Sequence, residues 1–225
     1  HRCSGDGGMT GGRSTPRTRI RRNALRAVYR LDQIKAVLDA NRLCHVAYVD
    51  AGEPRIIPTL YMRRGDYLYL HGNRQAALLH HLAQGGLASI SVMSVDGVVV
   101  ARSGFHCSMN YRSVVLFGKG EAVDAAQHEE ILDGFVETLI PGHGAVVRRP
   151  TPQELNATAA VRIAIDEASA KIRTGDAIDD ESDLDAEVWA GVIPLTVRAG
   201  EPEPNADLKD GIDVPDYIRG YQPLS

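Results

Sequence analysis

The sequence predicts a small, mainly antiparallel β-barrel with helices at its periphery. Six or seven segments have the apolar alternation or the short apolar run of a strand, and most are joined by short turns. The strand–helix–strand alternation that builds a doubly wound parallel sheet is absent. Antiparallel strands in this number tend to close into a barrel, because closure removes unpaired sheet edges.

The first predicted elements follow one another closely. Apolar residues at helical spacing indicate a short helix that runs to about Asn41. Two strands follow, LCHVAYVD (43–50) and RIIPTLYM (55–62), joined by the turn DAGEP, and RRGD then leads into YLYLHG (67–72). An amphipathic helix comes next and ends near Leu82.

The later elements are strands interrupted by two helices. LASISVMSV and VVVARS are predicted as the strands of a hairpin, because the Asp96-Gly97 between them is a strong turn signal. A long strand, RSVVLFGKGEAV (112–123), precedes a helix over about 125–139, and TPQE (151–154) has the form of a capping box. AVRIAIDEASAKIR is strand-like in its first half, and VWAGVIPLTV (188–197) is the last strong strand.

Length and charge indicate one large domain with extensions. A chain of 225 residues can bury a sizeable core. Residues 1–30 carry eight arginines against one acid and acids gather in the loop 175–187, although the net charge is −4. The Gly/Ser/Thr-rich composition of the basic N-terminal arm (1–26) favours a flexible, solvated segment over contact with nucleic acid.

Other features restrict the class of protein. No apolar run approaches the roughly 20 residues that span a bilayer, and no secretory h-region is found at the N-terminus. Cys3, Cys44 and Cys107 lack zinc spacing, so we expect no metal site and a reduced, cytoplasmic setting, with Cys44 as a small core residue. Hydrolase, P-loop and zinc-protease motifs are absent.

The turn within YLYLHGNRQAALLHHL (67–82) is of a kind that often binds phosphate. A helix N-terminus after a strand offers free backbone N–H groups and a favourable dipole. Here the first turn holds Gln75, Ala76 and Ala77, where a phosphate site usually has Ser, Arg or Lys. The turn therefore predicts either a phosphorylated cofactor held mainly by backbone, or a site that kept its architecture and lost that ligand.

Four segments of the chain resemble a known family when they are taken together. They are HVAYVDAGEPRIIPTLYMRRGDYLYLHGN (45–73), GFHCSMNYRSVVLFGKGEAV (104–123), IDEASAKIRTGD (165–176) and VWAGVIPL (188–195). In combination they resemble the FMN-binding split barrels of the pyridoxamine-5′-phosphate-oxidase-like family, closest to its flavin-nucleotide-binding and nitroimidazole-resistance branch. The resemblance covers 27–202, leaves 203–225 as a C-terminal tail, and implies a six- to seven-stranded split barrel that binds FMN as a homodimer.

The resemblance also implies a set of cofactor-binding residues. They are Arg55, Ile57, Pro58, Thr59, His71, Gly72, Arg74, Ser113, Lys171 and Arg173. Arg55 would pair with the phosphate through its planar fork, and Arg74 would compensate for the two alanines. Nitroimidazole-resistance proteins carry a histidine at the position that matches His71, which makes His71 a catalytic candidate.

The second wall of the implied site is the strand entry at SMNYRSVV. Ser113 matches a flavin-contacting position of the oxidases, and alternation along the strand would turn Arg112 the other way. Tyr111, the other catalytic candidate, would stack on the ring or bond a substrate; a plain rim position is the alternative. Lys171 could approach the same anion or be solvated, whereas Trp189 is predicted to pack in the core.

Three functions remain open from the sequence. The first is an FMN-dependent oxidoreductase that acts on a small molecule, with nitro-group reduction as one reaction that the branch implies. The second is a non-catalytic binding protein that holds flavin, or haem or a deazaflavin in its place, which the alanines at 76 and 77 favour. The third is a DNA-associated regulator that uses the basic arm.

Overall fold

The computed structural model describes residues 14–223. Residues 1–13, which include Cys3 and half of the predicted arm, and residues 224–225 lie outside the described residues. The α-helices are α1 (Leu31–Asp39), α2 (Ala77–Ala83), α3 (Ala125–Leu139), α4 (Pro152–Ala157) and α5 (Asp216–Arg219). The strands are β1 (Ala27–Val28), β2 (Leu43–Asp50), β3 (Glu53–Leu60), β4 (Met62–Arg64), β5 (Tyr67–Asn73), β6 (Leu87–Val100), β7 (Ser108–Ala122), β8 (Thr158–Ala164), β9 (Ala168–Arg173) and β10 (Gly191–Pro194).

The strands form an open antiparallel barrel. Their order is β3-β2-β6-β7-β8-β5-β4, while β9 pairs with β7 and β1, and β10 pairs with β6. Strand β7 turns the sheet, because its first part pairs with β9 and its last part with β8. The path ends at β3 and β4 without closing, so the predicted mainly antiparallel split barrel with peripheral helices is confirmed.

Two hydrophobic clusters hold the fold together. The larger lies inside the sheet, where alternate residues of each strand point inward against α1 and α2; Val46, Ile90 and Leu116 are fully buried there. The smaller lies under α3, whose Ile131 and Phe135 pack on β4, β5 and β8. Each large aliphatic or aromatic side chain buried in this way contributes about 1.5–3 kcal/mol.

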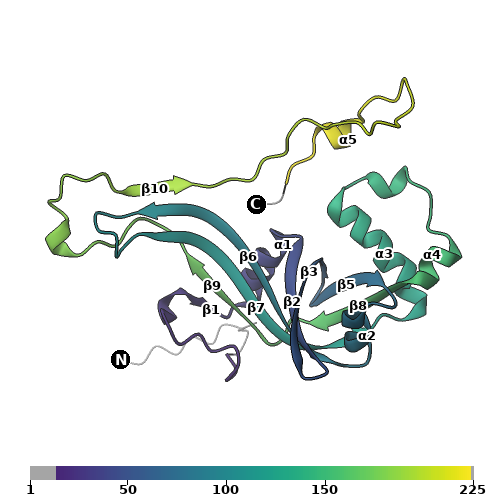
Figure 1. Cartoon of the computed structure of the whole chain (residues 1–225), viewed down its shortest axis with the longest axis horizontal. Helices are drawn as coiled ribbons and strands as arrows, with labels where there is room; N and C mark the ends of the chain where they lie inside the picture. The colour runs from purple at the N-terminus through teal and green to yellow at the C-terminus, as the bar shows by residue number, and fades with distance from the viewer. Residues whose placement is uncertain (1–13, 224–225) are drawn as a thin grey trace, which may run out of the picture.

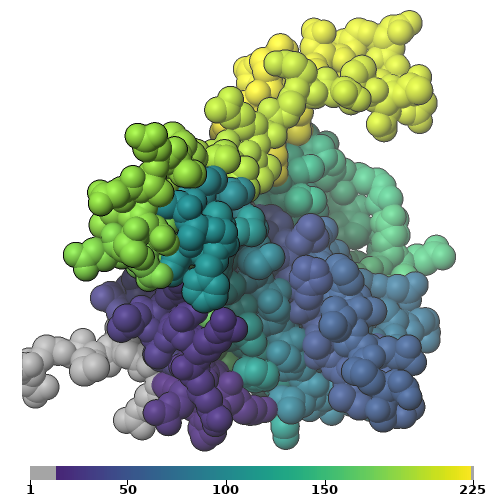
Figure 2. Space-filling view, turned by 60° about the vertical axis from the view of Figure 1, so that its left-hand side comes forward, coloured from purple at the N-terminus to yellow at the C-terminus, as the bar shows by residue number. Residues whose placement is uncertain are grey.

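One end of the molecule projects beyond the barrel. The ends of β6 and β7 extend together with β10 and the segment after β9, which we call the projecting arm (residues 95–109 and 174–194; Figure 1). The described part of the N-terminal arm lies on the same side of the molecule (Figure 2), where β1 pairs with β9. Its Thr15 hydroxyl donates to the Glu167 carboxylate at 2.6 Å, and Thr18 is buried.

The predicted hairpin at Asp96-Gly97 is wrong. Strand β6 continues through both residues, with a register shift between Val95 and Gly97. The Asp96 carboxylate accepts hydrogen bonds from the Arg112 guanidinium of β7 at 2.7 to 3.2 Å. Gly97 faces the backbone of β10, where a Cβ would lie 3.0 Å from the Ile193 carbonyl oxygen. The turn residues therefore form a bulge and a close strand contact.

Other predictions are partly corrected. Residues 158–173 form two strands, β8 and β9, rather than a strand in the first half alone. Trp189 is 65% exposed and precedes the short strand β10, so its predicted core role is wrong. The capping box at Thr151 and Glu154, the span of α3 and the burial of Cys44 are confirmed.

Two features are absent from the described part of the chain. Within residues 14–223, no helix is long and apolar enough to cross a bilayer. The same residues contain no cluster of three or more His, Cys, Asp or Glu side chains arranged to hold a metal ion.

Candidate cofactor site

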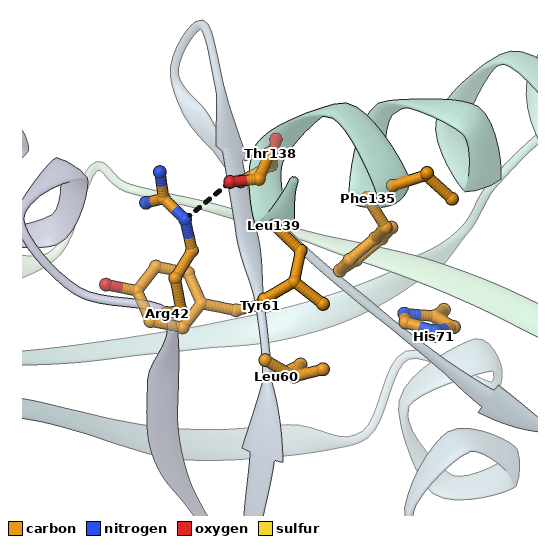
Figure 3. Close-up of a pocket in the computed structure, with 8 residues that line it drawn as sticks. Arg42, Leu60, Tyr61, His71, Phe135, Thr138 and Leu139 are labelled. Atoms are coloured by element: carbon orange, nitrogen blue, oxygen red, sulfur yellow. Dashed lines mark hydrogen bonds between the residues drawn. The ribbon is translucent and has the colours of Figure 1, made fainter. Parts of the chain in front are cut away.

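Two cavities meet at His71, near the end of β5. The α3 cavity, of about 140 Å³, lies between β3, β5 and α3 (Figure 3) and is lined by Arg42, Leu60, Tyr61, His71, Phe135, Val136, Thr138 and Leu139. The α2 cavity, of about 270 Å³, is lined by Tyr48, Ile57, Thr59, Leu70, His71, Gly72 and residues 76–79. Both have mainly apolar walls, which are typical of cofactor sites.

His71 carries the chemistry of these cavities. Its ring centroid lies 4.1 Å from that of Phe135, so α3 covers one side of the imidazole. Its Nδ1 is buried and has no hydrogen-bond partner among residues 14–223. Burial lowers the pKa of His71 below its usual value, because the charged form loses solvation. At neutral pH the ring is therefore a neutral imidazole with an unpaired nitrogen, as a metal ligand must be.

The turn into α2 has no phosphate-binding side chain. Ala76 is the N-cap of this short helix and makes no side-chain cap, and both Ala76 and Ala77 line the α2 cavity. Arg74 does not compensate for the alanines. Its guanidinium donates to the carbonyl oxygens of Asn156 at 2.6 Å and Thr158 at 3.1 Å, at the junction of α4 and β8. The cavity is therefore apolar where the family resemblance implies a phosphate.

Four of the ten predicted cofactor-binding residues line the α2 cavity. Ile57 and Thr59 of β3 line the α2 cavity with His71 and Gly72. Arg55 lies on the same face of β3, opposite Tyr48, which also lines the cavity. Pro58 alternates to the outer face of the sheet and pairs with His45.

The remaining predicted residues lie elsewhere within one chain. Ser113 pairs with Lys171, next to the core pair Val114 and Ala170, so both face outward from the barrel. The Arg173 guanidinium is buried and donates to the Asn110 side chain and to the carbonyl oxygens of Gly175 and Asp176. Tyr111 sits opposite Arg173 at the base of the projecting arm.

Arg42 and Tyr61 are cavity residues that the sequence did not indicate. The Tyr61 hydroxyl donates to the Leu38 carbonyl at 2.5 Å and is buried, and burial raises its pKa. Arg42 donates from Nε to the Thr138 carbonyl at 2.9 Å. Since Thr138 lies 96 positions further along the chain, only the converging ends of α1 and α3 create this contact, and no local sequence signal could have shown it.

The fold and the cavities define a split-barrel protein of the flavin-binding class. The sequence profile of the pyridoxamine 5′-phosphate oxidase family matches residues 30–172. The chain belongs to this family, and the predicted resemblance is confirmed. No protein in the curated collection matches the chain significantly.

Solved structures agree with this assignment. The FAD and haem binding protein from Mycobacterium smegmatis is 38% identical, with a TM-score of 0.84 over 88% of this chain and 98% of that chain. The flavocytochrome Anf3 from Azotobacter vinelandii is also 38% identical, with a TM-score of 0.86 over 91% and 95%. A 5-nitroimidazole antibiotic resistance protein candidate from Bacteroides thetaiotaomicron, 17% identical, has a TM-score of 0.55 over 65% of this chain and 86% of that chain, and shares the fold alone.

Proposed function

We propose that this protein is a flavin- and haem-binding oxidoreductase in which His71 ligates the haem iron. The observation that carries the proposal is the buried, unpartnered Nδ1 of a neutral histidine between two apolar cavities. The two relatives at 38% identity are named for FAD and haem and as a flavocytochrome, which supports the same pair of cofactors here.

The residue types around His71 match those that hold a haem. A porphyrin needs apolar walls and one axial ligand, and a proximal histidine is a common ligand. Leu70, Leu79 and Phe135 supply apolar surface on both sides of His71. The lowered pKa of His71 keeps the imidazole neutral, and therefore able to coordinate, at the pH of the cell. When bound, the haem would supply one-electron redox chemistry, and this chain's residues would position it and exclude water.

FAD is the favoured flavin, in place of the FMN that the sequence suggested. The terminal phosphate of FMN is a dianion and needs charged partners, whereas the flavin-proximal phosphate of FAD carries one charge. Without a basic side chain at Ala76 or Ala77, an FMN phosphate at this turn would lose about 1.5–3 kcal/mol. Arg55, which lies on the same face of β3 as Ile57 and Thr59, and the backbone of residues 57–59 remain the proposed flavin contacts.

A homodimer would complete the site. Large apolar side chains are exposed on the outer face of the sheet, including Val49 at 59%, Ile56 at 64% and Met93 at 62%. Exposed apolar side chains on one face of a sheet favour association. A second copy seated on this face would bring its own residues to the Ser113 and Lys171 side of the sheet, and Ile56→Lys should then yield a monomer by light scattering.

Absorption spectroscopy of the purified chain tests the proposal. We expect a Soret band and a flavin spectrum, and acid release should yield FAD rather than FMN. His71→Ala should abolish the Soret band, whereas His80→Ala should keep it, because His80 bonds to Gln84 on the exposed side of α2. A protein without haem, or a Soret band that survives His71→Ala, would contradict the assignment.

Stopped-flow reduction under anaerobic conditions separates turnover from storage. In an oxidoreductase, reduction of the flavin is followed by reduction of the haem and reoxidation by a small-molecule acceptor. A haem that stays oxidised beside a fully reduced flavin would favour the non-catalytic binding protein instead.

A further inference from the structure

We propose that the C-terminal segment (residues 195–223) forms, with the end of α3, a binding site for a small phosphate-bearing molecule. This segment runs from the end of β10 over the barrel to α5 and beyond (Figure 1). All of it lies outside residues 30–172, the part of the chain that the family profile matches. One wall of the site therefore comes from outside the shared barrel, and the proposal does not rest on the haem and flavin function.

A cavity of about 580 Å³ separates the C-terminal segment from the end of α3. Ile140, which directly follows α3, lines one side, and the C-terminal segment lines the rest with residues 198–202, 218, 219, 221 and 222. Small-molecule sites usually measure about 300–1,000 Å³. The cavity therefore has room for a small organic molecule rather than for a single ion.

Contacts near both ends hold the C-terminal segment against the barrel. At its start, the Leu195 N–H donates to the Asp96 carbonyl oxygen at 3.1 Å. Near its end, a hydrogen bond of 2.9 Å joins the Tyr217 hydroxyl of α5 to Nδ1 of His143, in the short turn after α3. The walls of the cavity are thus ordered before a ligand arrives, which lowers the entropy cost of binding.

The lining of the cavity has more cations than anions. Arg198 and Arg219 line it, against the single acid Glu201. Neither arginine forms an ion pair with a carboxylate of residues 14–223, whereas Arg149, in the loop between α3 and α4, pairs with two. Arg219 donates to the Val214 carbonyl oxygen at 3.0 Å, which orders its guanidinium and leaves its charge without an anion.

A third arginine, Arg42, lies at the edge of this cavity. It donates to the carbonyl oxygen of Thr138, two positions before Ile140, and in Figure 3 the free end of its guanidinium turns away from the α3 cavity. Burial lowers the pKa of Arg42, and Tyr61 and then Tyr221 of the new cavity partly oppose this effect, because both phenols lie near the guanidinium. Arg42 therefore adds a positive charge beside Arg198 and Arg219.

Three guanidinium groups favour a phosphate over a single carboxylate. One guanidinium fork satisfies a carboxylate, whereas a phosphate monoester carries about 1.5–2 negative charges at pH 7 and has oxygens for several arginines. Ile140, Ile218 and the ring of Tyr221 supply apolar surface beside these charges. This lining matches an organic phosphate whose apolar or aromatic part packs on that surface.

Calorimetric titration of the full chain as purified, at constant ionic strength, tests the site with phenyl phosphate. Wild type should bind phenyl phosphate about ten-fold more tightly than inorganic phosphate, because the ring is buried against the apolar wall. Phenol keeps the ring and lacks the phosphate, so it should bind at least about ten-fold more weakly than phenyl phosphate.

Substitutions in the lining locate the bound phosphate. Arg198→Gln and Arg219→Gln should each weaken phenyl phosphate about ten-fold, whereas Glu201→Gln should strengthen it by removing the one acid of the lining. Arg22→Gln is the matched control, because Arg22 is exposed on the N-terminal arm and does not line the cavity. Arg198 and Arg219 are also exposed, so these variants should fold, which thermal unfolding checks.

The outcomes decide the proposal without reference to haem or flavin. Wild type that binds neither phenyl phosphate nor inorganic phosphate would overturn the site, and so would unchanged affinity for phenyl phosphate in both Arg198→Gln and Arg219→Gln. An equal loss in Arg22→Gln would show a general effect of surface charge and would also overturn it. In each case the role of His71 stands or falls by its own spectra.

Discussion

The cavity region and the projecting arm use arginine in opposite ways. At the arm, Asp96 pairs with Arg112 of β7 at 2.7 Å, and Arg102 pairs with Asp179 at 2.9 Å, so each of these cations has an anion. In the cavity region, Arg42 donates hydrogen bonds only to backbone carbonyl oxygens. The paired charges in the arm stabilise the chain itself, whereas the polar groups without such a partner around the cavity are the ones expected to bind a ligand.

The largest effect expected from this comparison is on stability. Phe135→Ala should lower the free energy of unfolding by about 3 kcal/mol, because Phe135 is only 8% exposed and covers His71. Phe105→Ala, in the projecting arm, should change it by less than about 0.5 kcal/mol, since Phe105 is 91% exposed. Urea unfolding measures both, and similar losses would break the distinction between the two regions.

Restoring a basic phosphate site should have the next largest effect. The double variant Ala76→Ser with Ala77→Arg places a hydroxyl and a cation on the wall of the α2 cavity. We expect FMN to bind about ten-fold more tightly, because the added cation meets its phosphate. Ala83→Arg adds the same charge at the other end of α2, and equal effects from both would show a general charge effect instead.

The sequence predicted well the features that residues close together in the chain determine. The apolar strand at 43–50 placed Cys44 in the core, and the capping box fixed the start of α4. The failures depend on distant segments. Gly97 became part of a continuous strand because β7 and β10 pair with it on its two sides. Arg42 lines a cavity because it bonds to carbonyl oxygens near the ends of both α1 and α3.

The candidate site shows the same division. The family resemblance selected His71, yet the apolar cover over its ring comes from Phe135 of α3, which follows α2, β6 and β7 in the chain. Ser113 and Lys171 were predicted beside the flavin, but the register of β7 with β9 turns them away from His71 within one chain. Which face of a sheet meets a ligand depends on the partner surface, and a single sequence does not encode that directly.

Loss of the ion pair between Arg102 and Asp179 should increase local opening of the arm rather than lower the stability of the whole chain. Asp179 has a 1% exposed side chain and accepts from both the backbone N–H and the guanidinium of Arg102, which hold its pKa low against the opposing effect of desolvation. Arg102→Gln should speed proteolysis within 175–187 by about ten-fold. Arg64→Gln breaks the exposed pair with Glu130 and should leave that rate unchanged.

The smallest effect expected is the pH dependence that His71 confers on the haem-free protein. Burial lowers its folded-state pKa below the usual 6.5. The unfolded chain therefore binds the proton more readily, and stability is complete above about pH 6.5 and falls as the pH drops toward the folded-state value. His71→Phe removes the titrating group and should flatten the stability profile between pH 7 and 5, whereas His80→Phe, on the exposed side of α2, should keep the wild-type slope. If the stabilities of wild type and His71→Phe fall in parallel over this range, the cavity does not hold His71 in its neutral form. The contrast between polar groups without a partner at the cavity and paired charges in the arm would then lose its most direct chemical support.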